Sequence, residues 1–220
     1  MLDFCTKVLD RFEKKEFVIV NDCSKDNTLQ VLEKLSKEIS YLKILNNEIN
    51  SGHGKSLRRA YENAQGELIF HCDSDNQFIA GDFWKLYDVL KQKKLEIAIG
   101  YRKERYDALH RLAITRVLRL MGFLFFGVKV RDSNSPFKLY TRAALDKLLK
   151  IVPSDIFAPS LTMNIAAKKI GIAMEEIPVN HLPRKTGKVS IIRWKLIKVC
   201  CQCVKELLQF RRILTNYEKG

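Results

Sequence analysis

The sequence predicts an α/β domain of the Rossmann-like kind, with a mainly parallel central sheet. Short apolar runs alternate along the chain with segments that carry apolar residues every three or four positions. Such alternation is typical of strands that alternate with helices. A chain of 220 residues suits one domain with a full core. We expect that domain to cover residues 1–190 and a basic, amphipathic helical tail to cover residues 191–220.

Each predicted element follows from its own apolar spacing. Short and mostly apolar runs predict strands, and longer segments with helical spacing predict helices. In chain order we expect a helix at residues 1–12, a strand at 17–20, a helix at 28–36, a strand at 42–45, a helix at 56–64, a strand at 67–72, a helix at 82–91 and a strand at 96–100.

Polar clusters follow the predicted strands after Val20, Leu45, Cys72 and Ile99. In parallel α/β sheets, ligands bind at the carboxyl ends of the strands. These four strand ends would meet at one edge of the sheet. We therefore expect the chemistry of the protein at that edge.

Composition limits the classes of protein to which the chain can belong. Hydrophobic residues make up 46% and charged residues 29%, so the composition is neither disordered nor membrane-spanning. The longest strongly apolar run covers residues 121–128, whereas a bilayer-spanning helix needs ~20 residues. No secretory signal opens the sequence. We expect a cytoplasmic protein.

The net charge of +14 predicts an anionic partner. Nucleic acid, anionic lipid head groups and phosphorylated substrates all fit such a charge. No recognisable RNA- or DNA-binding motif is present, so we expect no nucleic-acid partner. A protein whose surface is merely basic is the alternative.

Asp73 and Asp75 come directly after the strand predicted at residues 67–72. Hard divalent cations such as Mg²⁺ and Mn²⁺ take oxygen ligands and often bridge a protein carboxylate to substrate phosphates. Gln77 would add a third oxygen or bind a phosphate. An ordinary Asp-rich turn is the alternative, because two aspartates at this spacing are common.

Asp22 ends the first predicted strand, where its carboxylate is placed to accept a hydrogen bond from the N–H of a nucleotide base. Asp26 or Asn27 would then cap the following helix. Residues 51–56 read S-G-H-G-K-S, but a P-loop requires glycine where Ile49 stands. A glycine loop that opens a helix can still approach phosphate or sugar closely.

Taken together, these segments resemble glycosyltransferase family 2. Residues 20–28 read V-N-D-C-S-K-D-N-T, similar to the family's V-D-D-x-S-x-D-x-T. Residues 50–54, with Ala60 nearby, look like its N-x-G-x-G-x-x-x-A loop. Residues 73–77 look like its D-x-D-x-Q motif.

Two later blocks resemble the polyprenyl-phosphate branch of that family, which includes the dolichyl-phosphate mannose and glucose synthases. Residues 132–140 read D-S-N-S-P-F-K-L-Y, similar to D-x-x-x-G-F-K-L-F. Residues 176–190 match the ending E-x-P-V-x-x-x-P-R-x-x-G-x-x-S. The five blocks span residues 17–190 in the expected order.

The resemblance implies a GT-A type domain that binds a UDP- or GDP-linked sugar donor. A divalent cation would neutralise charge on the departing nucleoside diphosphate. Mg²⁺ or Mn²⁺ would be held by Asp73, Asp75 and Gln77, and the two aspartates would be catalytic. The donor would be bound by Asp22, Ser24, Gly52, Gly54 and Lys55.

The same resemblance implies a lipid-phosphate acceptor and inverting transfer of a hexose. A phosphate oxygen is already anionic, whereas a saccharide hydroxyl would need a general base, for which Asp132 is the candidate. Transfer to such a hydroxyl is one alternative, and a non-catalytic membrane-associated protein derived from such an enzyme is the other. The acceptor phosphate would be held by Arg102, Arg131, Arg184 and Lys188.

Three features depart from the family pattern. Asn21 replaces the first carboxylate of V-D-D, and Pro136 stands where the family has glycine. The family's first strand and its P-x-Y-N-E turn have no counterpart, because Met1 falls in the helix that would follow them. A sheet that lacks a strand exposes an edge and apolar surface. We expect one of three explanations: the true start of the protein lies upstream of Met1, the sheet is completed in another way, or the enzyme is impaired.

The tail and the stretch 105–131 both combine basic with apolar residues. A basic amphipathic helix can lie in a head-group interface, pack on its own domain or form the seam of a homo-oligomer. We expect the first, with the protein peripheral on the cytoplasmic face of an anionic membrane. The apolar stripe of the tail consists of Leu196, Cys200, Cys203, Leu207, Phe210 and Leu214.

Overall fold

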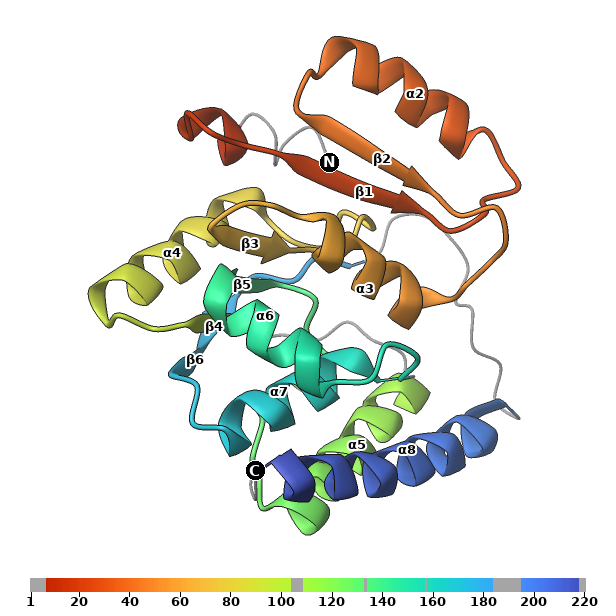
Figure 1. Ribbon diagram of the computed structural model, residues 1–220, viewed down its shortest axis with the longest axis vertical. Coiled ribbons are helices and arrows are strands. Elements are labelled where there is room, and N and C mark those ends of the chain that lie inside the picture. Colours follow the sequence, from red (N-terminus) through yellow and green to blue (C-terminus); the bar gives the residue numbers. More distant parts are fainter. Residues whose placement is uncertain (1–6, 104–108, 133, 157, 184–194, 218–220) are drawn as a thin grey trace.

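The computed structural model describes residues 7–103, 109–132, 134–156, 158–183 and 195–217 (Figure 1). Its helices and strands alternate for most of the chain, as the apolar spacing predicts. The strands are β1 (Phe17–Asn21), β2 (Leu42–Asn46), β3 (Leu68–His71), β4 (Ile97–Arg102), β5 (Lys138–Thr141) and β6 (Met174–Val179). The helices are α2 (Thr28–Glu38), α3 (His53–Asn63), α4 (Phe83–Gln92), α5 (Leu109–Phe126), α6 (Arg142–Ile151), α7 (Pro159–Lys169) and α8 (Lys195–Tyr217).

The elements predicted between residues 17 and 100 are all confirmed, with ends that shift by a few residues. Helix α3 begins at His53, three residues before the predicted start, so Gly54 and Lys55 lie in its first turn. The helix predicted at residues 1–12 is confirmed only in part of its described residues. Lys7 is in an α-helix, and Leu9–Arg11 form a short 3-10 turn.

The strands form two sheets. Strands β1 and β2 pair in parallel. The second sheet has the order β3-β5-β4-β6, in which β4 and β6 are parallel and β5 runs antiparallel to both of its neighbours. Since β3 and β4 both oppose β5, they run parallel to each other, and β5 is inserted between them. The arrows of β1, β2 and β3 point the same way in Figure 1.

Strand β1 keeps an unpaired edge in the part of the chain that the structure describes. It pairs there with β2, and β3 pairs with β5. The four apolar residues at 17–20 of β1 are all half-buried. The described residues therefore cover the apolar side chains of β1 only in part.

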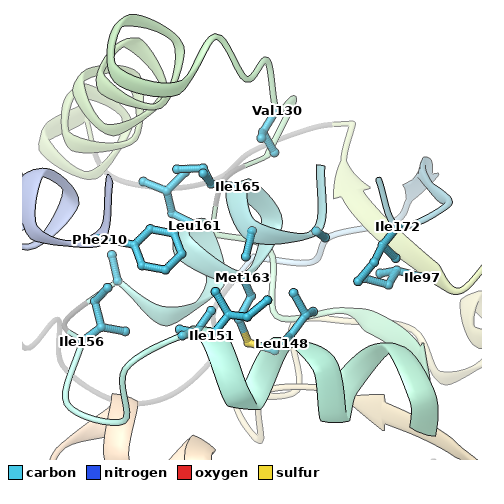
Figure 2. Close-up of a cluster of buried hydrophobic side chains, with 14 of the residues drawn as sticks. Ile97, Val130, Leu148, Ile151, Ile156, Leu161, Met163, Ile165, Ile172 and Phe210 are labelled. Carbon is cyan, nitrogen blue, oxygen red and sulfur yellow. The ribbon is translucent and has the colours of Figure 1, made fainter. Parts of the chain in front are cut away.

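The larger hydrophobic cluster lies between helices α5, α6, α7 and α8 and one face of the four-stranded sheet. Figure 2 shows Phe210 of α8 beside Leu161 and Ile165 of α7. A smaller cluster joins α4 to the other face of the sheet and includes Phe83 and Phe137. The two clusters hold the sheet between layers of helices.

The predicted membrane-facing stripe of the tail is wrong for its described side chains. Cys203, Leu207, Phe210 and Leu214 have exposed fractions of 0–3% and belong to the larger cluster. Helices α5, α6 and α7 all contact α8 and cover this stripe, so a membrane is not needed to bury it. The alternative of packing on the domain is the one that the structure supports.

Candidate functional site

Asp22 holds the start of helix α3 against the end of β1. Its carboxylate accepts the N–H groups of Ser51 at 2.8 Å and Gly52 at 2.9 Å, and the side-chain amide of Asn47 at 2.8 Å. Burial acts to raise the pKa of Asp22, but these hydrogen bonds outweigh it, so the pKa lies below its usual value. Asp22 is therefore an ionised group that fixes the glycine loop.

The residue next to Asp22 explains one departure from the family motif. Asn21 is 4% exposed, and its side-chain amide donates to Oδ1 of Asn46 at 2.7 Å. A buried amide makes this bond between β1 and β2 without carrying an unpaired charge. Asp26 accepts the N–H of Thr28, the first residue of α2, at 3.0 Å, whereas the N-cap residue Asn27 makes no side-chain cap bond.

The backbone requires glycine at both positions of the loop, for a different reason at each. Gly52 has a φ of +83°, which favours glycine. A Cβ on Gly54 would lie 2.6 Å from the carbonyl oxygen of Ile156. The exposed side chain of Lys55 lies in the first turn of α3, and a helix N-terminus favours anions. Ser24 is also exposed; its role in binding the donor stays a prediction.

Asp73 and Asp75 follow β3 in a tight turn. Oδ1 of Asp75 accepts the N–H of Gln77 at 3.3 Å, and the intervening Asn76 has a φ of +58°. The side chain of Asp73 is 40% exposed, and Nε2 of His71 lies 3.8 Å from its Oδ1. The turn presents two carboxylates next to each other at the end of a strand.

Gln77 ties this turn to the segment that follows β6. Its side-chain amide donates to the carbonyl of Leu182 at 3.0 Å, and the N–H of Leu182 donates to the carbonyl of Gln77 at 2.8 Å. The residue is 8% exposed. Its amide therefore has a structural partner, which the predicted role of metal ligand did not anticipate.

Arg102 and Asp132 form a buried pair. Nε of Arg102 donates to Oδ2 of Asp132 at 2.7 Å and Nη2 donates to Oδ1 at 3.0 Å, and both side chains are less than a tenth exposed. Such a two-pronged pair is strong and rigid. In this structure the fork of Arg102 faces Asp132 rather than an acceptor, and both oxygens of Asp132 accept from Arg102. Neither arrangement was foreseen in the roles predicted for these two residues.

Of the two predicted phosphate ligands in the described ranges, Arg131 is the one with an exposed side chain. Its guanidinium lies over the ring of Tyr101 at 5.0 Å, and Nη1 donates to the Tyr101 hydroxyl at 3.1 Å. The side chain is exposed. The other two predicted phosphate ligands, Arg184 and Lys188, lie outside the described residues.

Sequence reasoning missed a buried lysine in this region. Lys138 of β5 is fully buried and donates to the carbonyl of Ser160 at 3.2 Å and to Oδ1 of Asn164 at 3.0 Å. Burial lowers the pKa of Lys138 to about 7, although nearby carboxylates, including those of Asp132 and Asp73, act to raise it. Its place between the apolar residues Phe137 and Leu139 was the available signal.

Electrostatic interactions join these groups into one site. Burial acts to raise the pKa of Asp73, but His71, His53 and Arg102 outweigh it, so the pKa lies below its usual value. His53 directly follows Gly52, which Asp22 holds, and Arg102 binds Asp132. The structure therefore brings together the carboxyl ends of β1, β3 and β4, as predicted.

The carboxylates suit a hard divalent cation. Asp73 is ionised, both carboxylates are partly exposed, and oxygen is the ligand that Mg²⁺ and Mn²⁺ prefer. No group of three His, Cys, Asp or Glu side chains that could hold a metal occurs among the described residues. A cation here would need oxygens from a substrate, as at sites where Mg²⁺ binds substrate phosphates.

A family model for glycosyl transferase family 2 matches residues 1–149. The chain belongs to this family. The match covers the strand ends that carry Asp22, Asp73, Asp75 and Arg102. Membership in glycosyl transferase family 2 confirms the family predicted from the motifs.

Curated relatives come from the polyprenyl-phosphate branch of the family. A dolichyl-phosphate beta-glucosyltransferase of Trichomonas vaginalis is 27% identical over 187 residues, which cover 80% of this chain and 57% of that protein. A dolichyl-phosphate beta-glucosyltransferase of Saccharomyces cerevisiae is 29% identical over 187 residues, which cover 75% of this chain and 56% of that protein. The chain thus spans little more than half the length of these two relatives.

Solved structures confirm the GT-A type fold. The glucosyl-3-phosphoglycerate synthase of Mycobacterium tuberculosis, crystallised with Mn²⁺, uridine diphosphate and phosphoglyceric acid, superposes with a TM-score of 0.63 at 16% identity. The superposition covers 96% of this chain and 72% of that one.

Proposed function

We propose that this family 2 glycosyltransferase moves a hexose from a UDP- or GDP-linked donor to a polyprenyl phosphate, with inversion at the sugar carbon. The observation that carries the proposal is the Asp73–Asp75 turn at the edge where Asp22 holds the glycine loop. The names of the curated relatives, which are dolichyl-phosphate glucosyltransferases, support the acceptor class.

The donor diphosphate would lie between the Asp73–Asp75 turn and the first turn of α3. Asp73 and Asp75 would hold Mg²⁺ or Mn²⁺, and the cation would neutralise charge on the departing nucleoside diphosphate. The solved relative that contains both Mn²⁺ and uridine diphosphate supports a divalent cation in this fold. Lys55 and the N-terminus of α3 would add positive charge beside the phosphates.

The acceptor side favours a phosphate over a saccharide hydroxyl. A hydroxyl needs a base to remove its proton, and the candidate base, Asp132, already binds Arg102 through both oxygens. A phosphate oxygen attacks as an anion and needs cations to hold it. Arg131, stacked on Tyr101, would supply one cation. Arg184 and Lys188, in the block 176–190 that resembles the family, would supply two further cations.

Helix α5 gives the protein a face that suits an anionic membrane, and we place the contact there instead of on α8. Leu120, Phe123 and Leu124 have exposed fractions of 45–65%. A groove of about 400 Å³ beside them is lined by residues that include Arg116 and Arg119. No helix in the described ranges is long and apolar enough to cross a bilayer. Peripheral contact on the cytoplasmic face would bring the site to its lipid acceptor.

A transfer assay with two acceptors tests the proposal. Labelled UDP- and GDP-hexoses are incubated with Mn²⁺ and either polyprenyl phosphate in vesicles or a soluble oligosaccharide. We expect labelled hexose in the lipid extract when the acceptor is polyprenyl phosphate and no labelled product when it is the oligosaccharide. A chelator should abolish transfer, and NMR of the product should show the inverted anomer. Transfer to the oligosaccharide in place of the lipid would contradict the proposed acceptor.

A further inference from the structure

A buried polar pair lies next to the Asp73 carboxylate. His71 is the last residue of β3, and its side chain is 9% exposed. Residues two apart in an extended chain point to the same side, so His71 and Asp73 share one face. Tyr61 of α3 is 4% exposed, and its hydroxyl lies 3.0 Å from Nδ1 of His71. The two rings meet edge to face with centroids 5.6 Å apart.

Two neighbours bear on the tautomer of His71: the Tyr61 hydroxyl at Nδ1 and the Asp73 carboxylate beside Nε2. When the phenol donates to Nδ1, the ring proton lies on Nε2. Nε2 is 3.8 Å from Oδ1 of Asp73. The other tautomer would set a nitrogen lone pair against a carboxylate oxygen, which is repulsive. The donors therefore run in one direction, from Tyr61 to His71 and from His71 towards Asp73.

Packing alone does not account for this pair. The neighbour of His71 on the same strand face is Ile69, and Leu57 of α3 also belongs to the surrounding cluster. An apolar side chain would fill the position of His71 without the cost of burying an imidazole. What the imidazole adds is a directed N–H beside a carboxylate at the edge of the site.

We propose that His71, held by Tyr61, is a positioning residue that orients the Asp73 carboxylate towards a divalent cation. The inference rests on the proposed function, because it names the group that arranges the same cation site. The 3.8 Å between Nε2 and Oδ1 is longer than a hydrogen bond, so the proposal requires Asp73 to turn towards His71 when it binds the cation. Carboxylates that bind metals are held by outer partners in this way.

Mn²⁺ affinity, measured by electron paramagnetic resonance in the presence of UDP or GDP, tests the role of His71. Replacing the donor in His71→Leu should weaken Mn²⁺ binding ~10-fold or more. His71→Gln places an amide N–H near the position of Nε2 and should restore affinity to within ~3-fold of the natural protein. Binding of UDP without metal, followed by calorimetry, should be the same in all variants, because His71 acts through the cation.

Two tyrosine variants separate positioning from packing. Tyr61→Phe removes the hydroxyl that binds His71 and should weaken Mn²⁺ binding. Tyr140→Phe is the matched control: Tyr140 is 1% exposed and packs against Tyr61, and no hydrogen bond joins its hydroxyl to His71. It should leave Mn²⁺ affinity unchanged. If His71→Leu fails to fold by circular dichroism, His71→Gln and this tyrosine pair still carry the test.

Three results would overturn the inference. The first is that His71→Leu binds Mn²⁺ as tightly as the natural protein. The second is that His71→Gln loses as much Mn²⁺ affinity as His71→Leu. The third is that Tyr61→Phe and Tyr140→Phe lose Mn²⁺ affinity equally. A natural protein that folds but binds no Mn²⁺ with either nucleotide would instead overturn the proposed function. The two failures are therefore distinguishable.

Discussion

Asp75 is the residue whose removal tests the cation site with least damage to the fold. Its side chain is partly exposed and receives one N–H, from Gln77. Asp75→Ala should lower hexose transfer by ~100-fold or more, because the diphosphate loses part of its counter-charge. Initial rates with saturating donor measure the loss.

The control for this variant is Asp88→Ala, which removes an exposed carboxylate from α4. It should transfer hexose at the natural rate. Equal rates in Asp75→Ala and the natural protein, with both folded, would remove Asp75 from the cation site.

Gly54 and Gly81 form a matched pair for the packing of the glycine loop. A Cβ on Gly54 meets the Ile156 carbonyl at 2.6 Å, whereas a Cβ on Gly81 meets nothing within 4 Å. Gly54→Ala should cost ~1–3 kcal/mol of stability, because a backbone atom has to move. Gly81→Ala should stay within ~0.5 kcal/mol. Thermal unfolding measures both, and equal midpoints would show that Ile156 yields without cost.

Lys138 should make stability depend on pH. Its folded pKa is about 7, and the unfolded value is ~10.4. Between these values the unfolded chain binds the extra proton, so the free energy of unfolding rises with pH across this window. Below pH 7 both states are protonated and the penalty is constant.

Lys138→Met removes this titration. The rise in stability from pH 7 to pH 9.5, measured by urea unfolding, should be smaller in the variant than in the natural protein. Identical pH slopes would mean that the buried lysine keeps its ordinary pKa.

Several site residues were predictable from the sequence because their signals are local. Asp22 and Asp73 each follow an apolar run, and Gly52 opens a helix. The pairing of Arg102 with Asp132 joins residues 30 positions apart. Such a contact depends on how strands pair in space, and no spacing in the sequence encodes it.

Helix α8 shows the same limit at the scale of elements. Its apolar stripe was visible in the sequence, but the surface that covers it comes from other elements, α5, α6 and α7. Phe210→Ala should therefore destabilise the protein by ~3–5 kcal/mol, since Phe210 is fully buried. Leu208→Ala, at a residue that is 45% exposed, should change little. Urea unfolding compares them, and equal midpoints would contradict the packing of α8.

The strand β5 is a second element whose role the sequence did not predict. Apolar alternation located the strands up to residue 100. It could not show that β5 inserts antiparallel between β3 and β4, because the order of strands in a sheet is set by long-range pairing. The expectation of a mainly parallel sheet holds for the other pairs, β1 with β2 and β4 with β6.

Helix α5 should carry the membrane contact. Leu124 of α5 is 65% exposed, and Val31 of α2 is 49% exposed. Helices α5 and α2 lie at opposite ends of the molecule (Figure 1). Leu124→Ser should weaken co-sedimentation with anionic vesicles several-fold, because buried apolar area drives insertion at the interface. Val31→Ser should bind like the natural protein. Equal effects of the two changes would place the contact elsewhere.

The whole molecule carries a net charge of +14, so vesicle binding should also weaken as salt rises. Binding to neutral vesicles that matches binding to anionic ones would contradict an electrostatic contribution. The same positive field favours the anionic donor and the anionic acceptor.

The central claim is that carboxylates at the rim of the sheet bind a divalent ion together with the diphosphate of a sugar nucleotide. Isothermal calorimetry of UDP and GDP uptake, with Mn²⁺ and with a chelator, tests it most directly. The account predicts that one of the two nucleotides binds at least ~10-fold more tightly with Mn²⁺, since the cation supplies the counter-charge for the diphosphate. The claim would be contradicted if the folded protein bound both nucleotides equally weakly with and without the cation.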